Sequence, residues 1–329
     1  MRILVMGGTS FVGRAIVEEA VLRGDEVTLL SRGRTGTELF PGIPRLVGDR
    51  DTGDYASLTA ALAGGADWDA VADVTAYVPR HVNQLADALG ASGGRYLLIS
   101  TGSVYDKSLA APDAMDEDAP RLAPIRDTEQ VTGETYGALK VACEDDARVR
   151  FDGRVTVVRP GIVAGPRDVT DRFTYWARRA ARGGQVAVPG RLDQPVQVVD
   201  SRDLARLVLQ LLHDDRPGTF NAVGPATPVT LAELVQACAE GAGAVVELVA
   251  VDPAAVADGF PLVLPDASWD PLYRRSAAAA REVGLTATSL AQTAADTLAW
   301  DRERGAPALA VELTAPQEHA LLQSATAAS

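Results

Sequence analysis

The chain has 329 residues, 47% apolar and 23% charged, which suits two domains or one domain with a lobe and excludes wholesale disorder. Its 31 basic and 44 acidic side chains give a formal charge of −13, which disfavours a nucleic-acid partner. Cys143 and Cys238 form no CxxC pair and the three histidines show no ligand spacing, so we expect no metal site. No run approaches the roughly 20 apolar residues that span a bilayer, and no segment directs the chain out of the cytosol, so we expect a cytoplasmic protein without membrane contact.

Short apolar runs alternate with longer segments of helical periodicity through the first 160 residues. We expect strands at Ile3–Met6, Glu26–Ser31, Ala70–Val74, Tyr96–Ser100 and Val155–Arg159, and helices at Phe11–Arg23, Tyr55–Ala63, Arg80–Leu89 and Tyr136–Arg148. The strands are continuously apolar, which indicates burial on both faces. The pattern therefore predicts an α/β fold with a doubly wound parallel sheet.

The pattern loosens after the fifth strand, where prolines punctuate the chain. A regular stretch returns at residues 196–223, followed by helices at Leu231–Glu240, Ser289–Arg304 and Ala315–Ala325. We expect residues 1–160 to form a dinucleotide-binding domain to which 196–223 returns. Residues 161–195 and 224–314 would form a smaller C-terminal substrate-binding lobe, and 315–329 a terminal helix and tail.

A glycine-rich segment, Gly7-Gly8-Thr9-Ser10-Phe11-Val12-Gly13, joins the first strand to the first helix. Gly7 permits a tight turn and Gly13 lets the helix pack closely, so amides at the helix N-terminus face a pyrophosphate. Ser10 stands where a GxxGxxG pattern has its middle glycine. A plain strand-to-helix turn is the alternative interpretation.

The second strand ends at Ser31-Arg32 without the acidic residue that usually accepts from the adenosine ribose in NAD sites. Arg32 favours NADP instead, because a guanidinium pairs with a 2′-phosphate. A solvated loop arginine, with NAD as the cofactor, remains the alternative.

Tyr136 and Lys140 lie four residues apart on one predicted helix face. Lys140 is one of only two lysines in the chain, the other being Lys107. A nearby ammonium lowers the pKa of a phenol toward working pH, so the pair suits acid–base chemistry. A surface pair of neighbouring side chains is the alternative.

Hydroxyl side chains gather after the fourth strand of this series, at Ser100, Thr101, Ser103 and Tyr105. The carboxyl ends of strands are where open α/β sheets bind ligands. Thr101 could therefore hold a substrate oxygen beside Tyr136, although an ordinary polar loop is the alternative.

These motifs together resemble the extended and atypical short-chain dehydrogenases/reductases, the NAD-dependent epimerase/dehydratase family with a Rossmann-type sheet. The resemblance runs through Gly7–Gly13, Gly48-Asp49, Ser100–Tyr105, Tyr136–Lys140, Arg159-Pro160, Gly165-Pro166, Asp203–Ala205 and Phe220-Asn221. It implies that Tyr136 is the general acid/base, that Lys140 tunes it and bonds the nicotinamide ribose, and that Thr101 is the catalytic hydroxyl residue.

The resemblance also implies which residues surround the ligands. We expect a cofactor site formed by Gly7, Thr9, Ser10, Phe11, Val12, Gly13, Ser31, Arg32, Asp49, Asp73, Val74, Thr75, Ser100, Tyr136, Lys140, Pro160 and Gly161. Candidate substrate contacts are Tyr77, Ser103, Tyr105, Glu134 and Arg172. Sugar dehydratases of this branch carry an Asp-Glu pair after the threonine, where this chain has Gly102-Ser103, so dehydration is disfavoured.

The expected function is NAD(P)-dependent hydride transfer at a secondary carbinol or ketone of a sugar-like or nucleoside-like small molecule. One alternative is a sugar epimerase that recycles tightly bound NAD(P). Another is a non-catalytic nucleotide sensor or an RNA-binding relative. The resemblance also allows a homodimer that pairs the helices at Arg80–Leu89 and Tyr136–Arg148.

Overall fold

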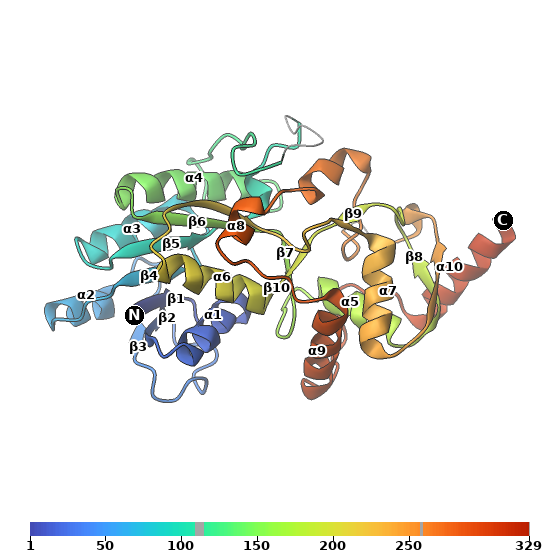
Figure 1. Ribbon diagram of the computed structural model, residues 1–329, viewed down its shortest axis with the longest axis horizontal. Helices are drawn as coiled ribbons and strands as arrows, with labels where there is room; N and C mark the ends of the chain where they lie inside the picture. Colours follow the sequence, from blue (N-terminus) through green and yellow to red (C-terminus); the bar gives the residue numbers. More distant parts are fainter. Residues whose placement is uncertain (109–114, 257–258, 329) are drawn as a thin grey trace.

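A computed structural model describes residues 1–108, 115–256 and 259–328 (Figure 1). Its centre is a seven-stranded parallel sheet in the order β11-β6-β5-β4-β1-β2-β3. The strands are β1 (Arg2–Met6), β2 (Glu26–Ser31), β3 (Arg45–Val47), β4 (Ala70–Asp73), β5 (Arg95–Ile99), β6 (Val155–Pro160) and β11 (Gly218–Ala222). The strand order reverses at β1, which creates a crevice at the carboxyl ends of β1 and β4. The predicted doubly wound fold is confirmed.

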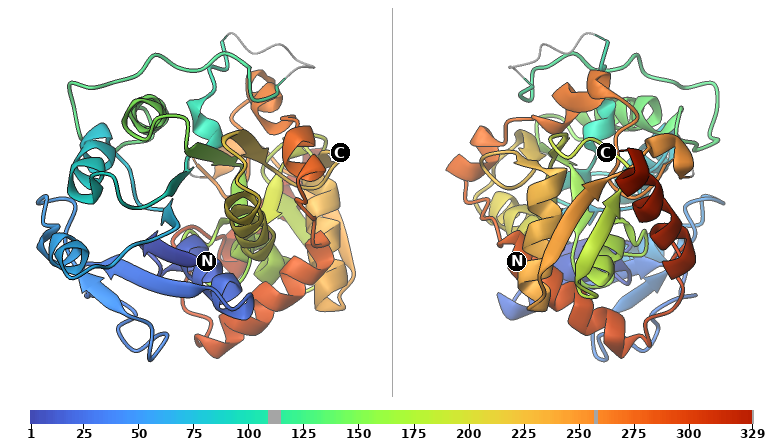
Figure 2. Two further views of the ribbon diagram at one scale, coloured as in Figure 1. Left: turned by 60° about the vertical axis from the view of Figure 1, so that its left-hand side comes forward. Right: turned by 90° about the vertical axis from the view of Figure 1, so that its right-hand side faces the viewer.

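Helices cover both faces of this sheet, as the continuously apolar strands predicted (Figure 2). Alternate β1 residues point to opposite faces: Ile3 and Val5 pack toward helices α1 (Phe11–Leu22) and α6 (Ser201–His213). The intervening Leu4 and Met6 pack on the other face. That face is covered by α2 (Ala56–Ala63), α3 (Pro79–Leu89) and α4 (Tyr136–Arg150).

The predicted strands and helices of the first 160 residues agree with the structure to within two residues at each end, and β3 was not anticipated. The return of 196–223 to the main sheet was only half right. β11 joins β6 there, whereas β10 (Val198–Asp200) pairs with β7 (Ile162–Ala164) in a separate two-stranded sheet. The β7–β10 pair leads the chain toward the C-terminal half (Figure 1).

The C-terminal half has its own apolar core, to the right of the main sheet in Figure 1. The fully buried Trp176 lies in this core, and its indole N–H donates to the carbonyl of Pro261 at 2.8 Å. The elements around it are α5 (Arg172–Ala180), β8 (Gly184–Val188), β9 (Pro195–Val196), α7 (Leu231–Ala242), β12 (Val229–Thr230), β13 (Val246–Ala250), α9 (Leu290–Glu303) and α10 (Ala315–Ala328). Sequence periodicity missed α5, β8 and β13.

Four short helices complete the described chain. They are η1 (Gly102–Val104), η2 (Pro253–Ala255), η3 (Ala267–Tyr273) and α8 (Ala278–Glu282). η1 follows β5 directly, whereas α8 packs on β11. Within 1–108, 115–256 and 259–328, no helix is both long and apolar enough to cross a membrane.

Candidate active site

The glycine-rich turn between β1 and α1 has a backbone that larger residues could not adopt. Gly7 has φ +88°, and a Cβ there would lie 2.2 Å from Cγ2 of Thr75. A Cβ at Gly13 would lie 2.0 Å from the carbonyl oxygen of Gly7. Ser10 occupies the N-cap position of α1 but makes no side-chain cap bond, and the first turn holds no acidic residue. The exposed helix N-terminus is therefore suited to an anion such as a pyrophosphate.

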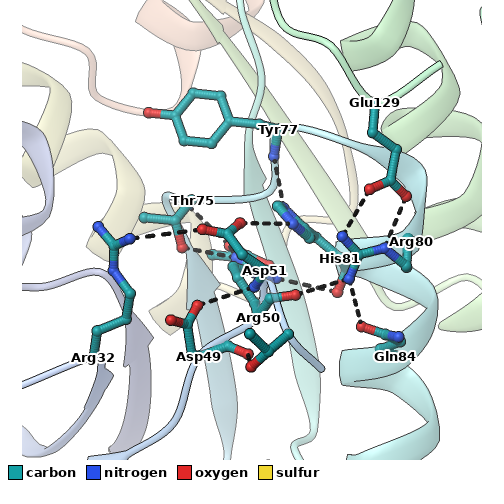
Figure 3. A network of polar contacts seen from close by, with 12 residues as sticks. Arg32, Asp49, Arg50, Asp51, Thr75, Tyr77, Arg80, His81, Gln84 and Glu129 are labelled. Carbon is teal, nitrogen blue, oxygen red and sulfur yellow. Dashed lines mark hydrogen bonds and ion pairs between the residues drawn. The ribbon is translucent and has the colours of Figure 1, made fainter. Parts of the chain in front are cut away.

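The loop after β2 brings two arginines close to two aspartates, and Figure 3 shows Arg32 beside Asp51. Nη1 of Arg32 lies 3.6 Å from Oδ2 of Asp51, and Nη2 of Arg34 lies 3.5 Å from Oδ2 of Asp49. The Arg32 side chain is 54% exposed, so this long ion pair holds it weakly. Both Arg32 and Asp49 thus lie at the expected adenosine end of the crevice.

Asp73, expected to line the cofactor, is instead fully buried in an ion pair. Nη1 and Nη2 of Arg50 donate to its two oxygens at 2.7 and 2.9 Å. Its carboxylate also accepts from the Tyr96 hydroxyl at 2.9 Å and from the Thr75 amide at 3.0 Å. Burial alone would raise the pKa of Asp73, but Arg50 outweighs it and the pKa is lowered. The carboxylate is therefore a support beneath the site, held by Arg50, Tyr96 and Thr75.

Arg50 couples that buried pair to the glycine-rich turn. Its Nη1 also donates to Oγ1 of Thr75 at 2.7 Å, and the Thr75 methyl lies where it blocks a larger residue at position 7. Half-buried Val74 and Thr75 thus remain at the crevice, beside the turn. Sequence reasoning missed Arg50, although it stands directly after the Gly48-Asp49 motif.

His81 lies in the same network at the start of α3 (Figure 3). Its Nδ1 accepts from the amide of Tyr77 at 3.4 Å, and Nε2 lies 3.3 Å from Oδ1 of Asp51. Burial, and next the charge of Arg50, lower the pKa of His81 to about 4. The imidazole is therefore neutral at physiological pH, and its role is to hold the turn before α3.

Tyr136, Lys140 and Thr101 meet at the carboxyl end of β5. Tyr136 begins α4, and the neighbouring Thr101 hydroxyl acts on its phenol so as to lower the pKa of that phenol. Lys140 lies one turn further along and is buried; its Nζ donates to the carbonyls of Ala76 at 2.7 Å and Ile99 at 2.8 Å. An ammonium has three donors, so one remains for a ligand. The three side chains predicted to carry the chemistry are thus brought together.

The expected lowering of the Tyr136 pKa by Lys140 is wrong in this structure. Burial raises the pKa of the phenol, and Thr101 and the charge of Arg172 oppose that rise. Lys140 instead points beneath Tyr77, with Nζ 6.0 Å from the centre of that ring, and burial lowers its own pKa. The phenol is consequently protonated at neutral pH.

The side chains of Ser100 and Tyr105, predicted to contact cofactor and substrate, are hydrogen-bonded in the interior. The Ser100 hydroxyl donates to Oε1 of Glu144 at 2.6 Å, and that carboxylate pairs with Arg159. Tyr105 is 2% exposed; its hydroxyl donates to Asn221 at 2.7 Å and accepts from Arg159 at 2.9 Å. This network fixes α4 and β6 beneath the site.

The other candidate residues lie around the Thr101–Tyr136 pair or on its margin. Tyr77 is 45% exposed and its ring centre lies 6.4 Å from that of Tyr136. Ser103 is exposed, and its hydroxyl accepts from Thr101 at 3.2 Å. Glu134 is exposed two residues before α4.

Arg172 and the residues at the end of β6 complete the site. Arg172 is exposed at the start of α5, and its charge acts on both Tyr136 and Asp168. Pro160 ends β6 and is buried, whereas Gly161 is half-buried, with its amide bonded to the carbonyl of Ala222 at 3.0 Å. Sequence reasoning missed Asp168, whose pKa is raised by burial.

Comparison with known protein families agrees with this geometry. A sequence model described as the NAD dependent epimerase/dehydratase family matches residues 3–223. A chloroplast stem-loop binding protein of 41 kDa from Arabidopsis thaliana is 27% identical over 74% of this chain; the match spans 63% of that protein. The dTDP-6-deoxy-L-talose 4-dehydrogenase (NAD(P)(+)) of Kitasatospora kifunensis is 28% identical over 82% of this chain and 86% of its own length.

Solved structures share the same fold. A putative epimerase from Burkholderia cenocepacia superimposes with a TM-score of 0.70 at 24% identity, over 92% of this chain and 98% of its own. The Bordetella bronchiseptica enzyme WbmH, in complex with NAD+, gives 0.66 at 20% identity, over 92% and 99%. At these identities the structural likeness establishes the fold.

Proposed function

Since the chain belongs to the NAD dependent epimerase/dehydratase family, we propose that it is a nicotinamide-dependent oxidoreductase acting on a secondary carbinol or ketone. Tyr136 beside Thr101, with Lys140 buried one turn further along the same helix, is the observation that carries the proposal. The expectation of an NAD(P)-dependent reductase or epimerase agrees with this family. A nicotinamide bound here supplies or accepts the hydride.

The acid–base step belongs to Tyr136. Its raised pKa keeps the phenol protonated at neutral pH, so it donates its proton to a ketone oxygen as that oxygen gains charge. Thr101 orients the same oxygen through its hydroxyl. The remaining N–H of Lys140 is directed to a ribose hydroxyl, while the carbonyls of Ala76 and Ile99 hold its position.

The proposed cofactor is NADP, with NAD as the alternative. Arg32 lies at the end of β2 and its 3.6 Å contact with Asp51 is long, so a 2′-phosphate would displace the aspartate with a shorter, charge-assisted bond. Asp49 and Asp51 oppose that preference by their negative charge. Titration of the nucleotide-free protein with NADPH and NADH, followed by fluorescence, measures the balance.

The proposed substrate is a sugar-like or nucleoside-like small molecule. One relative is named a dTDP-6-deoxy-L-talose 4-dehydrogenase and another a dTDP-4-dehydro-6-deoxy-D-allose reductase, so dTDP-linked 4-keto-6-deoxy sugars head the substrate panel. The net charge of −13 argues against RNA as the ligand, although a relative is named for binding stem-loops.

The deciding experiment replaces Tyr136 by phenylalanine. NADPH affinity should stay within a few-fold, and turnover on the panel should fall by on the order of 10²–10⁴, because only the proton donor is removed. Tyr175→Phe is the matched control, since its buried hydroxyl has no hydrogen-bond partner among the described residues. Unchanged turnover in Tyr136→Phe would reject the assignment. Release of tightly held NAD on denaturation would favour the epimerase instead.

A further inference from the structure

Five cationic side chains are buried in the described part of the chain, and two of them have no carboxylate partner. Arg50, Arg159 and Arg179 each form an ion pair with an acidic side chain. Lys140 and Arg275 form none among the described residues. A buried charge without a counter-charge is destabilising, so these two positions call for an explanation.

Both unpaired cations bind the backbone on either side of Thr101. Lys140 donates to the carbonyl of Ile99 at 2.8 Å, two residues before Thr101. Nη1 of Arg275 donates to the carbonyl of Gly102 at 3.2 Å, one residue after it. Arg275 comes from the loop after η3, so a segment distant in sequence delivers its charge to the reaction centre. The two positive charges therefore hold the backbone on either side of Thr101.

The Arg275 guanidinium occupies a slot that two glycines create. A Cβ at Gly102 would lie 2.2 Å from Nη1, and a Cβ at Gly161 would lie 3.3 Å from Nη2. Gln197 fixes the Arg275 backbone from both sides, accepting from its amide at 3.0 Å and donating to its carbonyl at 2.7 Å. Gly102 and Gly161 follow the adjacent strands β5 and β6, so the slot lies at the carboxyl edge of the sheet.

The bonding of this guanidinium leaves one edge without a protein acceptor. Nη1 is used by Gly102, whereas Nε has no hydrogen-bond partner in the described chain, and neither does Nη2. Arg275 is 7% exposed, and it forms no ion pair with an acidic side chain of the described residues. The chain has 44 acidic residues, yet none in its described part forms an ion pair with Arg275.

We propose that Arg275 recognises a carboxylate on the substrate, so that the ketone or carbinol reduced or oxidised here belongs to an acidic molecule. The planar Nε–Nη2 edge matches a carboxylate with two parallel hydrogen bonds, an arrangement that lysine cannot supply. Arg172, exposed and without a carboxylate partner in the described residues, adds positive charge on the side of Tyr136. The inference rests on the proposed function for the role of Thr101 and Tyr136.

The test titrates the full-length protein, with and without NADPH, with acetate, its neutral isostere acetamide, and inorganic phosphate at constant ionic strength. The arginine Nε–H signals are followed by NMR, and that of Arg275 is identified by its loss in Arg275→Gln. Acetate should shift the Arg275 signal saturably and acetamide should leave it in place. No acetate response, or an equal response to acetamide, overturns the proposal. A response to phosphate alone replaces the carboxylate by a phosphoryl group.

Two substitutions distinguish a loss of acetate binding from a loss of the folded structure. Arg275→Gln should weaken acetate binding by about 10- to 100-fold, as expected for losing charge-assisted hydrogen bonds. Arg274→Gln is the matched control, because it removes the same charge from the exposed neighbouring position. NADPH binding should be unchanged in both. If NADPH binds neither variant nor the native protein, the proposed function fails, whereas the acetate titration without NADPH still decides the role of Arg275.

Discussion

Replacing Arg50 by methionine probes the buried ion pair that supports the glycine-rich turn. Arg50 donates to both oxygens of the fully buried Asp73, at 2.7 and 2.9 Å. Without it, the carboxylate keeps only the Tyr96 hydroxyl and the Thr75 amide. Removing one partner of a buried pair costs about 3–5 kcal/mol, because the other charge stays desolvated. We expect Arg50→Met to lower the free energy of unfolding at pH 7 by that amount.

The effect of Arg50→Met should depend on pH in a defined direction. In the native protein the pKa of Asp73 is lowered, so its stabilisation is present above the unfolded pKa of about 3.9 and is lost as pH falls through the folded pKa. In the variant, burial acts without Arg50 and the folded pKa of Asp73 rises above the unfolded one. The variant therefore regains stability as pH falls. The difference in free energy of unfolding between the variant and the native protein should narrow as pH falls from 8 to 5.

Urea unfolding, monitored by tryptophan fluorescence and circular dichroism at pH 8, 7 and 5, measures this gap. The double variant Arg50→Met/Asp73→Asn leaves no buried charge and should recover most of the lost stability. A gap that stays constant with pH would refute the reasoning. A double variant no more stable than Arg50→Met would refute it equally, because the loss would then come from packing.

Two further predictions concern the turn and the histidine beside it. Gly13→Ala should reduce NADPH affinity by at least tenfold in fluorescence titration, because the new Cβ would lie 2.0 Å from the carbonyl oxygen of Gly7. Gly133→Ala is the control and should leave the affinity unchanged, because the space around Gly133 is open. The pKa of His81 is lowered to about 4, so between pH 6.5 and 4 the unfolded chain binds a proton that the native protein does not. The free energy of unfolding should fall by about 1–3 kcal/mol as pH drops through that window. In urea unfolding, His81→Gln should make the free energy of unfolding less dependent on pH. An imidazole NMR signal of His81 that titrates near pH 6.5 would contradict the lowered pKa.

Local patterns indicated the candidate reaction centre because its signals lie within single elements or turns. The Tyr136–Lys140 spacing is a property of one helix, and the Gly7–Gly13 segment is a property of one turn. Thr101 follows β5 directly, so its place at the carboxyl edge follows from the parallel sheet. These residues could be assigned before any tertiary contact was known.

The direction of each side chain could not be assigned in that way. Ser100 and Thr101 are consecutive, yet Ser100 turns toward Glu144 in the interior and Thr101 toward Tyr136. Successive residues at a strand end point to opposite sides, and a register error of one position exchanges their roles. The same argument explains why Asp73 was taken for a cofactor contact.

The sequence by itself determined the parallel sheet, the glycine-rich turn and the Tyr136–Lys140 pair, because hydrophobic periodicity and residue spacing are local properties of the chain. Only the tertiary structure decided which charges are paired. Arg50 meets Asp73 across 23 residues and Arg275 meets Gly102 across 173, and no local pattern encodes such contacts. The buried pair of Arg50 and Asp73 supports the glycine-rich turn. Arg275 is the candidate for binding the substrate, because a buried charge without a partner is destabilising until an anion neutralises it.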